Sequence, residues 1–298
     1  MNEEHAEQTA VTVVLLAGGI EHSLLRKQVG HAIGTLPISA KQSLLGCWLE
    51  RIAAEPRVRK VIVATSEVFD QADLRHAVSS AATKLAVDVV IDPDVHRGTA
   101  GVVADVLWHD DSTIMCVGEV SAVPPPSIGR AIDALGQERT LMVVGTCDDA
   151  RAIGFFAFHR KALGLVPRVG YFDLKEQFIN AVIKDGHIVR AVQLMDRHLR
   201  LTTLEGWLEA TKHFDGGIHQ AATVSDQARL EGSVCIEEGA RVGSASLCDA
   251  IIMRGAVVED GAIIARSVVG PGARVAQGRR VIDGIFLDAR APQLGQSL

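Results

Sequence analysis

Residues 224–242 read VSDQARLEGSVCIEEGARV, and in this stretch a branched apolar residue returns at every sixth position. The repeat continues to Val281, with steps of five residues on both sides of Leu247 and before Val269. Small residues and glycines fill the positions between, and aromatic residues are absent. Three hexads can turn one triangular coil with its apolar side chains inside, so the repeat predicts a left-handed parallel β-helix. The repeat positions are Val224, Leu230, Ile236, Val242, Leu247, Ile252, Val258, Ile264, Val269, Val275 and Val281.

Two other interpretations fit the repeats less well. A β-sandwich with evenly spaced strands would need hairpin turns and more aromatic residues than this stretch contains. Acyltransferases built on hexapeptide coils use a histidine as general base, but the last histidine here is His219, ahead of the coils. We therefore expect the repeats to serve assembly rather than catalysis.

The chain before the repeats alternates strand-like and helix-like segments. Val11–Leu16 is apolar apart from one threonine, as in a buried parallel strand, and it runs into Ala17-Gly18-Gly19, where a ligand can approach the backbone closely. Such alternation predicts a mostly parallel sheet with ligands beyond the carboxyl ends of its strands. Further strands are expected at 58–64, 86–91, 113–117 and 140–146, and helices at 44–54, in the seventies, at 101–108 and at 203–213.

These patterns divide the 298-residue chain into parts. We expect a disordered tail over residues 1–10, an α/β domain over 11–217, the β-helix over 218–284 and a C-terminal tail over 285–298. The boundary near Asp215-Gly216-Gly217 follows the last predicted helix. The three tryptophans, Trp48, Trp108 and Trp207, fall on predicted helices and are expected to pack in the core.

Composition narrows the classes of partner. A hydrophobic content of 48% can form a sizeable core, and interspersed charges giving a net −6 show no footprint for nucleic acid or membrane. The five cysteines are scattered and lack a C-x-x-C spacing, as expected for buried thiols in a reducing compartment. The apolar run 11–17 is too short to span a bilayer. We expect a cytoplasmic protein.

The strand end LAGG at 16–19, the loop GTAG at 98–101 and the C-terminal hexads together resemble the sugar-1-phosphate nucleotidyltransferases, nearest the mannose-1-phosphate guanylyltransferase branch. The resemblance covers nearly the whole chain and implies a Rossmann-like, GT-A-like α/β domain before the β-helix. Supporting segments, in order, are Leu36-Pro37-Ile38 with Lys41, 44–52, 154–158 (the family's AGIYVF), 171–174 (its FDLEKD) and 203–210 (its TPEDYLEA).

The resemblance also implies a nucleotide site made mostly of backbone. Its residues would be Leu16, Ala17, Gly18, Gly19, Gly98, Thr99, Ala100 and Gly101. They would contact the base and the ribose. For Gly98-Thr99 an alternative stays open, in which Thr99 is the N-cap of a helix that starts near Gly101.

The family's phosphate-binding cations are missing. Where its glycine loop continues G-T-R-L, this chain has Glu21, His22, Ser23 and Leu24, and Ile33 stands at its later lysine. These cations stabilise charge during nucleotidyl transfer, so their loss predicts impaired catalysis. Arg26 and Lys27 are the nearest candidate replacements. The insertion with the family's EKP signature is also absent, because only residues 147–153 separate the strand ending at Thr146 from Gly154.

The family's metal ligands are altered as well. Glu119 stands at the aspartate of its NGD turn, and Arg200 stands at the second aspartate. Magnesium needs several oxygen ligands, so we expect an ion pair of Glu119 with Arg200 in place of the metal. Asp196 is the only nearby substitute carboxylate.

Three functional hypotheses follow. The preferred one is a degenerate family member that binds a nucleotide or nucleotide-sugar and assembles with itself, most simply as a dimer, or with an active relative. The second is an active transferase in which Arg26 or Lys27 supplies the cation, and Glu119 with Asp196 holds magnesium. The third is a scaffold whose cleft is filled by Ile20, His22 and Leu24.

Overall fold

The computed structural model describes residues 10–18, 24–66, 68–81, 83–92, 94–137 and 139–287. The chain divides into two compact units. Unit 1 comprises Met1–Ile20 and Leu45–His198, and unit 2 comprises Glu21–Leu44 and Leu199–Leu298. The predicted combination of a mostly parallel α/β sheet with later parallel strands is confirmed.

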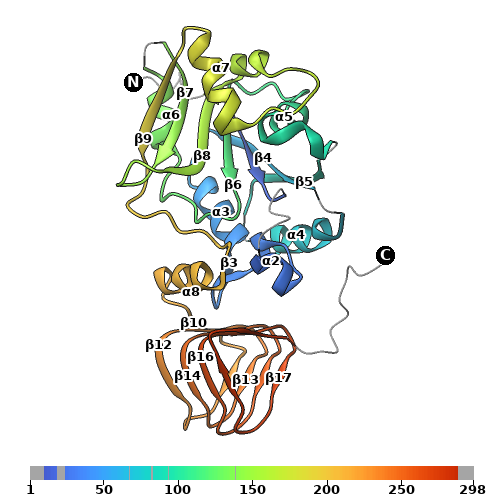
Figure 1. Ribbon diagram of the computed structural model, residues 1–298, viewed down its shortest axis with the longest axis vertical. Coiled ribbons are helices and arrows are strands. Elements are labelled where there is room, and N and C mark those ends of the chain that lie inside the picture. Colours follow the sequence, from blue (N-terminus) through green and yellow to red (C-terminus); the bar gives the residue numbers. More distant parts are fainter. Residues whose placement is uncertain are drawn as a thin grey trace. The chain divides into compact units, whose positions relative to one another are not determined.

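Unit 1 contains a seven-stranded sheet in the order β5-β4-β1-β6-β8-β7-β9 (Figure 1). Its strands are β1 (Val11–Leu16), β4 (Val58–Thr65), β5 (Ala86–Ile91), β6 (Ile114–Glu119), β7 (Thr140–Thr146), β8 (Ala152–His159) and β9 (Ile188–Gln193). All neighbours are parallel except β8, which runs antiparallel to β6 and β7. All six residues of β1 are buried, as a strand covered on both faces requires.

Helices connect these strands. They are α3 (Leu44–Ala53), α4 (Val68–Ser80), α5 (Gly98–Val106), α6 (Gly129–Leu135) and α7 (Ile179–Lys184), with short turns η2 (Val95–Arg97), η3 (Arg160–Leu165) and η4 (Leu174–Phe178). A shared core joins α5, η4 and α7 to strands β1, β4, β6, β7 and β8. No described helix combines the length and the apolar character needed to cross a membrane.

The predicted helix at 101–108 differs from the observed one. It begins three residues earlier, at Gly98, and ends at Val106. Trp108 therefore lies beyond the helix, and it is 56% exposed rather than packed in the core. Its ring is covered instead by the guanidinium of Arg168, 5.0 Å from the ring centroid. The core predictions for Trp48 and Trp207 are confirmed.

The repeats of unit 2 form two parallel sheets whose strands stack as successive coils (Figure 1). Paired residues on neighbouring coils are 16 to 18 positions apart in the sequence, as in the row Val224, Val242, Val258 and Val275. One sheet contains β10 (Gly217–Ile218), β12 (Arg229–Ile236), β14 (Ser246–Ile252), β16 (Ile263–Val269), β18 (Arg280–Ile282) and β19 (Ile285–Phe286). The other contains β11 (Thr223–Val224), β13 (Arg241–Val242), β15 (Val257–Val258) and β17 (Arg274–Val275).

The repeat positions from Ile236 to Val281 all belong to one buried core, and Val224 packs against it. Leu230 is the exception, with 38% of its surface exposed. It pairs with Leu247 on one side, but on the other side β10 reaches only Cys235 and Ile236. Leu230 is exposed because no described strand covers the first half of β12.

Unit 2 also contains segments that the sequence placed in the α/β domain. These are α2 (Leu24–Val29), η1 (Ile33–Thr35), β2 (Pro37–Ser39), β3 (Gln42–Ser43) and α8 (Leu204–His213). The buried indole of Trp207 donates to the Pro37 carbonyl at 2.7 Å, and the Ala40 amide donates to the Gly216 carbonyl at 3.0 Å. These bonds join residues 21–44 to the segment that precedes the repeats, and so place both in unit 2.

Candidate functional site

Three of the predicted nucleotide-binding residues, Leu16, Ala17 and Gly18, lie at the carboxyl end of the central strand β1. After β1, the Ala17 amide donates to the Ala64 carbonyl at 2.8 Å, which continues the sheet for one residue. At Gly18 a Cβ atom would lie 2.5 Å from the Ser66 amide nitrogen, so only glycine fits there. The Ser66 hydroxyl is buried and has no hydrogen-bond partner in the described part of the chain. Gly19 lies outside the described residues.

An acidic residue follows the edge strand β5, which pairs with β4. The Asp92 amide donates to the Thr65 carbonyl at 2.7 Å, which fixes Asp92 at the strand end. Burial raises the pKa of Asp92, and the nearby charges of Asp94 and Asp105 add to this effect, whereas a hydrogen bond from the Asp94 amide lowers it. Sequence reasoning did not single out Asp92.

The GTAG loop is held against a distant segment of unit 1. Gly98 has φ of +71° and ψ of 169°, a conformation open essentially only to glycine. A Cβ atom there would lie 2.9 Å from the Phe172 carbonyl oxygen. That oxygen accepts hydrogen bonds from the amides of Ala100 at 2.9 Å and Gly101 at 3.2 Å. Two donors of the first helical turn are therefore already paired within the protein.

Thr99 does not cap the helix. Because α5 begins at Gly98, Thr99 lies inside the first turn, and the predicted start at Gly101 with Thr99 as N-cap is wrong. Its hydroxyl donates to the Asp173 carboxylate at 2.8 Å and accepts from the Leu174 amide at 2.9 Å. The side chain thus fixes the segment that follows Phe172. Nucleotide contact by the loop stays a prediction.

Residues 168–175, which we call the strap, are fastened along α5 at several points. Arg97 is 5% exposed, and its guanidinium donates to the Asp105 carboxylate at 3.0 and 3.2 Å and to the Gly170 carbonyl at 3.0 Å. Hydrogen bonds to Asp105 raise the pKa of Arg97, so this buried cation stays charged. Arg97 stands directly before GTAG in the sequence, but its role could not be predicted because the Gly170 carbonyl that it contacts lies 73 residues away.

The strap ends at the carboxylate predicted as a metal ligand. Glu119 is the last residue of β6, and its Oε1 lies 2.6 Å from the Nζ of Lys175. The Glu119 side chain is 18% exposed and lies against Gly154, where a Cβ atom would come within 2.8 Å of the carboxylate carbon. Lys175 occupies the position of glutamate in the resembling FDLEKD motif, so this charge reversal was visible in the sequence but was missed.

The remaining candidates are placed as follows. Arg26, Lys27 and Arg200 belong to unit 2, so their predicted roles at the strand ends of unit 1 stay predictions. The Asp196 carbonyl accepts from the Asp148 amide at 3.2 Å. Leu24 is 69% exposed and also belongs to unit 2, so its predicted place in a filled cleft stays a prediction. Ile20 and His22, the other two residues of the scaffold hypothesis, lie outside the described residues.

The donor groups do not suit a magnesium site. Of the two predicted ligands, Glu119 forms an ion pair with an ammonium group, which would repel a divalent cation. Across the described ranges, no group of three or more histidine, cysteine, aspartate or glutamate side chains is arranged to hold a metal ion. Magnesium usually requires several carboxylate, water and phosphate oxygens.

Three of the cysteines, Cys47, Cys116 and Cys235, offer no activated thiolate. All five are free, and four are buried. Burial raises the pKa of Cys47 to about 11, and it raises the pKa of Cys116 and Cys235 as well. A thiol with such a pKa stays protonated near neutral pH, so it is a poor nucleophile.

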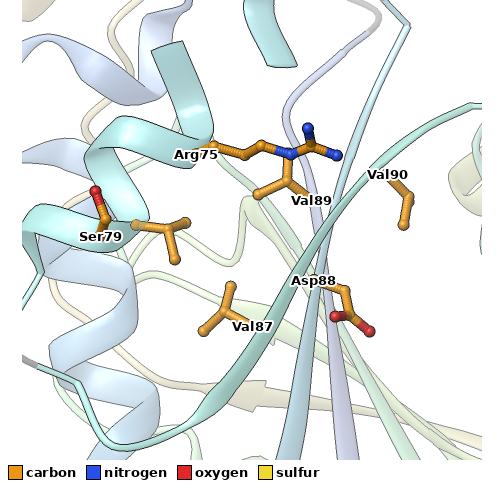
Figure 2. Close-up of a pocket in the computed structure, with 7 residues that line it drawn as sticks. Arg75, Ser79, Val87, Asp88, Val89 and Val90 are labelled. Atoms are coloured by element: carbon orange, nitrogen blue, oxygen red, sulfur yellow. The ribbon is translucent and has the colours of Figure 1, made fainter. Parts of the chain in front are cut away.

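A pocket of about 420 Å³ lies elsewhere in unit 1 (Figure 2). Helix α4 supplies Arg75, Val78 and Ser79, and strand β5 supplies residues 87–90. None of the predicted nucleotide-binding residues lines it.

Neither a protein-family model nor a curated protein matches this chain.

Proposed function

We propose that the chain is a nucleotidyltransferase-like protein that binds a nucleotide or nucleotide-sugar and does not transfer it. In this proposal unit 1 is a Rossmann-like, GT-A-like domain, and the repeats of unit 2 are a left-handed parallel β-helix. Strand β1 ends in the LAGG segment, and its parallel neighbour β6 ends at Glu119, and both segments resemble the family. A homo-oligomeric assembly, or assembly with an active relative, and a cytoplasmic location belong to the same proposal.

Backbone geometry supports binding. Gly18 offers a strand end without a side chain, and the nearby Ser66 hydroxyl lacks a partner among the described residues. A buried hydroxyl without a partner costs free energy, which a ligand atom would recover by hydrogen bonding. These features suit the polar groups of a base or a ribose.

The ion pair between Lys175 and Glu119 is the observation that carries the proposed loss of catalysis. Nucleotidyl transfer depends on metal ions that bridge phosphate oxygens and neutralise the charge that develops there. Lys175 neutralises the carboxylate that would bind such an ion. A single ammonium can attract a phosphate as a point charge, but it does not replace a bridging metal.

A thermal-shift titration against nucleoside triphosphates and nucleotide-sugars tests this proposal. A ligand at about one hundred times its dissociation constant stabilises the folded state by about 2.7 kcal/mol, which raises the melting temperature by several degrees. We expect this rise to be the same with magnesium and with a chelator. We also expect no pyrophosphate release when sugar 1-phosphates are added.

The alternatives predict different results. Stabilisation that requires magnesium, together with pyrophosphate release, would establish an active transferase. If no compound of the panel stabilised the protein, the scaffold hypothesis, in which the cleft binds nothing, would be favoured. A light-scattering mass equal to one chain at micromolar concentration would exclude the proposed self-assembly.

A further inference from the structure

The pocket between α4 and β5 has the form of a groove along the edge of a sheet. Successive side chains of a strand point to opposite faces, yet the four consecutive residues 87–90 all line the pocket. A pocket that touches side chains from both faces of β5 must lie along the edge of this strand. Its other wall is one helical face, since Arg75, Val78 and Ser79 are spaced three and four positions apart.

Strand β5 leaves hydrogen-bonding groups available in this groove. It is the outermost strand of the sheet, and among the described strands it pairs only with β4. The Asp92 amide points to β4, because it donates to the Thr65 carbonyl. Backbone groups of a parallel strand alternate in direction, so those of Val87 and Val89 point away from β4. The Gln71 side chain donates to the Val89 carbonyl at 3.2 Å, which agrees with this direction and means that this carbonyl already has one partner.

The charges along the groove favour an anionic occupant. Arg75 extends from α4 toward Val89 (Figure 2), and it forms no ion pair with any described residue. The nearest acid on the strand, Asp88, is already paired with Lys60 at 2.8 Å. Lys84, two residues before β5, is a second exposed cation without an ion pair in the described ranges. A carboxylate placed beside Arg75 would therefore meet an uncompensated positive charge.

We propose that this groove binds an extended peptide segment of a partner protein, which adds a strand to β5 and places a carboxylate at Arg75. Backbone hydrogen bonds to the edge would supply affinity, and alternate side chains would select the sequence. The apolar floor of Val78, Val87 and Val89 fits small branched side chains. This inference is independent of the proposed nucleotide site, because none of its residues belongs to that site.

Synthetic peptides test the proposal on the full chain. The probe is the capped hexapeptide Thr-Val-Glu-Val-Thr-Val, and the comparison peptide has lysine in place of glutamate. We expect the first to bind with a dissociation constant below about 1 mM and to shift the amide resonances of Val87 and Val89. Arg75→Glu should weaken this binding about tenfold and should make the lysine peptide the better ligand.

The control is Arg130→Glu, which reverses an exposed arginine on α6 and should leave both affinities unchanged. Three results would overturn the proposal. The first is an absence of binding at millimolar concentration, and the second is equal affinity of both peptides for the unmodified chain. The third is a concentration-dependent doubling of mass that the peptide abolishes, because it would make a second copy the occupant of the groove.

Discussion

Replacing Trp48 by alanine is expected to lower the free energy of unfolding by about 4 kcal/mol. The side chain is 1% exposed and stacks on Phe155 with ring centroids 6.3 Å apart. Its indole nitrogen donates to the Ala122 carbonyl at 2.8 Å. The glycine at position 118 gives the ring its space, since a Cβ atom there would lie 2.7 Å from it. Alanine would leave a cavity and an unpaired buried carbonyl, and denaturant unfolding measures the loss.

Trp108→Ala is the matched control, because it removes the same side chain from an exposed position in the same unit. Its cost should stay below about 1 kcal/mol, mainly from the lost contact with Arg168. An equal loss in the free energy of unfolding for the two variants would show that the packing of Trp48 in the core does not stabilise the fold.

The second large effect is expected at Gly98. An alanine would require φ of +71° with an extended ψ, and its Cβ would approach the Phe172 backbone to within 3.0 Å. The strained conformation costs about 1–3 kcal/mol, and the contact with backbone atoms adds to it. We expect Gly98→Ala to destabilise unit 1 by about 3 kcal/mol and to increase hydrogen exchange at Ala100 and Gly101, whose amides bond to Phe172.

Gly164→Ala serves as the comparison, because a Cβ atom at Gly164 would meet nothing within 4 Å. That variant should change stability by less than about 1 kcal/mol. If Gly98→Ala were equally harmless, the bonds between the GTAG loop and the strap would not be important for the fold.

The repeats were predictable because their period alone determines which side chains meet. Nine of the eleven repeat positions became core residues, from Ile236 to Val281. The prediction that Leu230 is buried failed because Leu230 lies at the start of the repeats. The period does not show that the strand before it, β10, covers only Cys235 and Ile236. The helix at Gly98 began earlier than expected because the fixing contacts come from the strap, whose sequence position gives no local signal.

The candidate site was predictable in its backbone and not in its charges. A glycine that directly follows an apolar strand can be recognised in the sequence, and Gly18 is such a case. The ion pair of Glu119 with Lys175 joins residues 56 positions apart, and the expected pair of Glu119 with Arg200 stays a prediction because Arg200 belongs to unit 2. Long-range ion pairs depend on how the strap crosses the strand ends, and no pattern of spacing shows this.

The proposed binding of a nucleotide or nucleotide-sugar in unit 1 should not need magnesium, because Lys175 already neutralises Glu119. Calorimetric titration of the nucleotide or nucleotide-sugar that stabilises the protein most, with magnesium and again with chelator, measures this directly. Dissociation constants that agree within about twofold are the predicted result. Binding that is about tenfold tighter or more with magnesium would contradict the account.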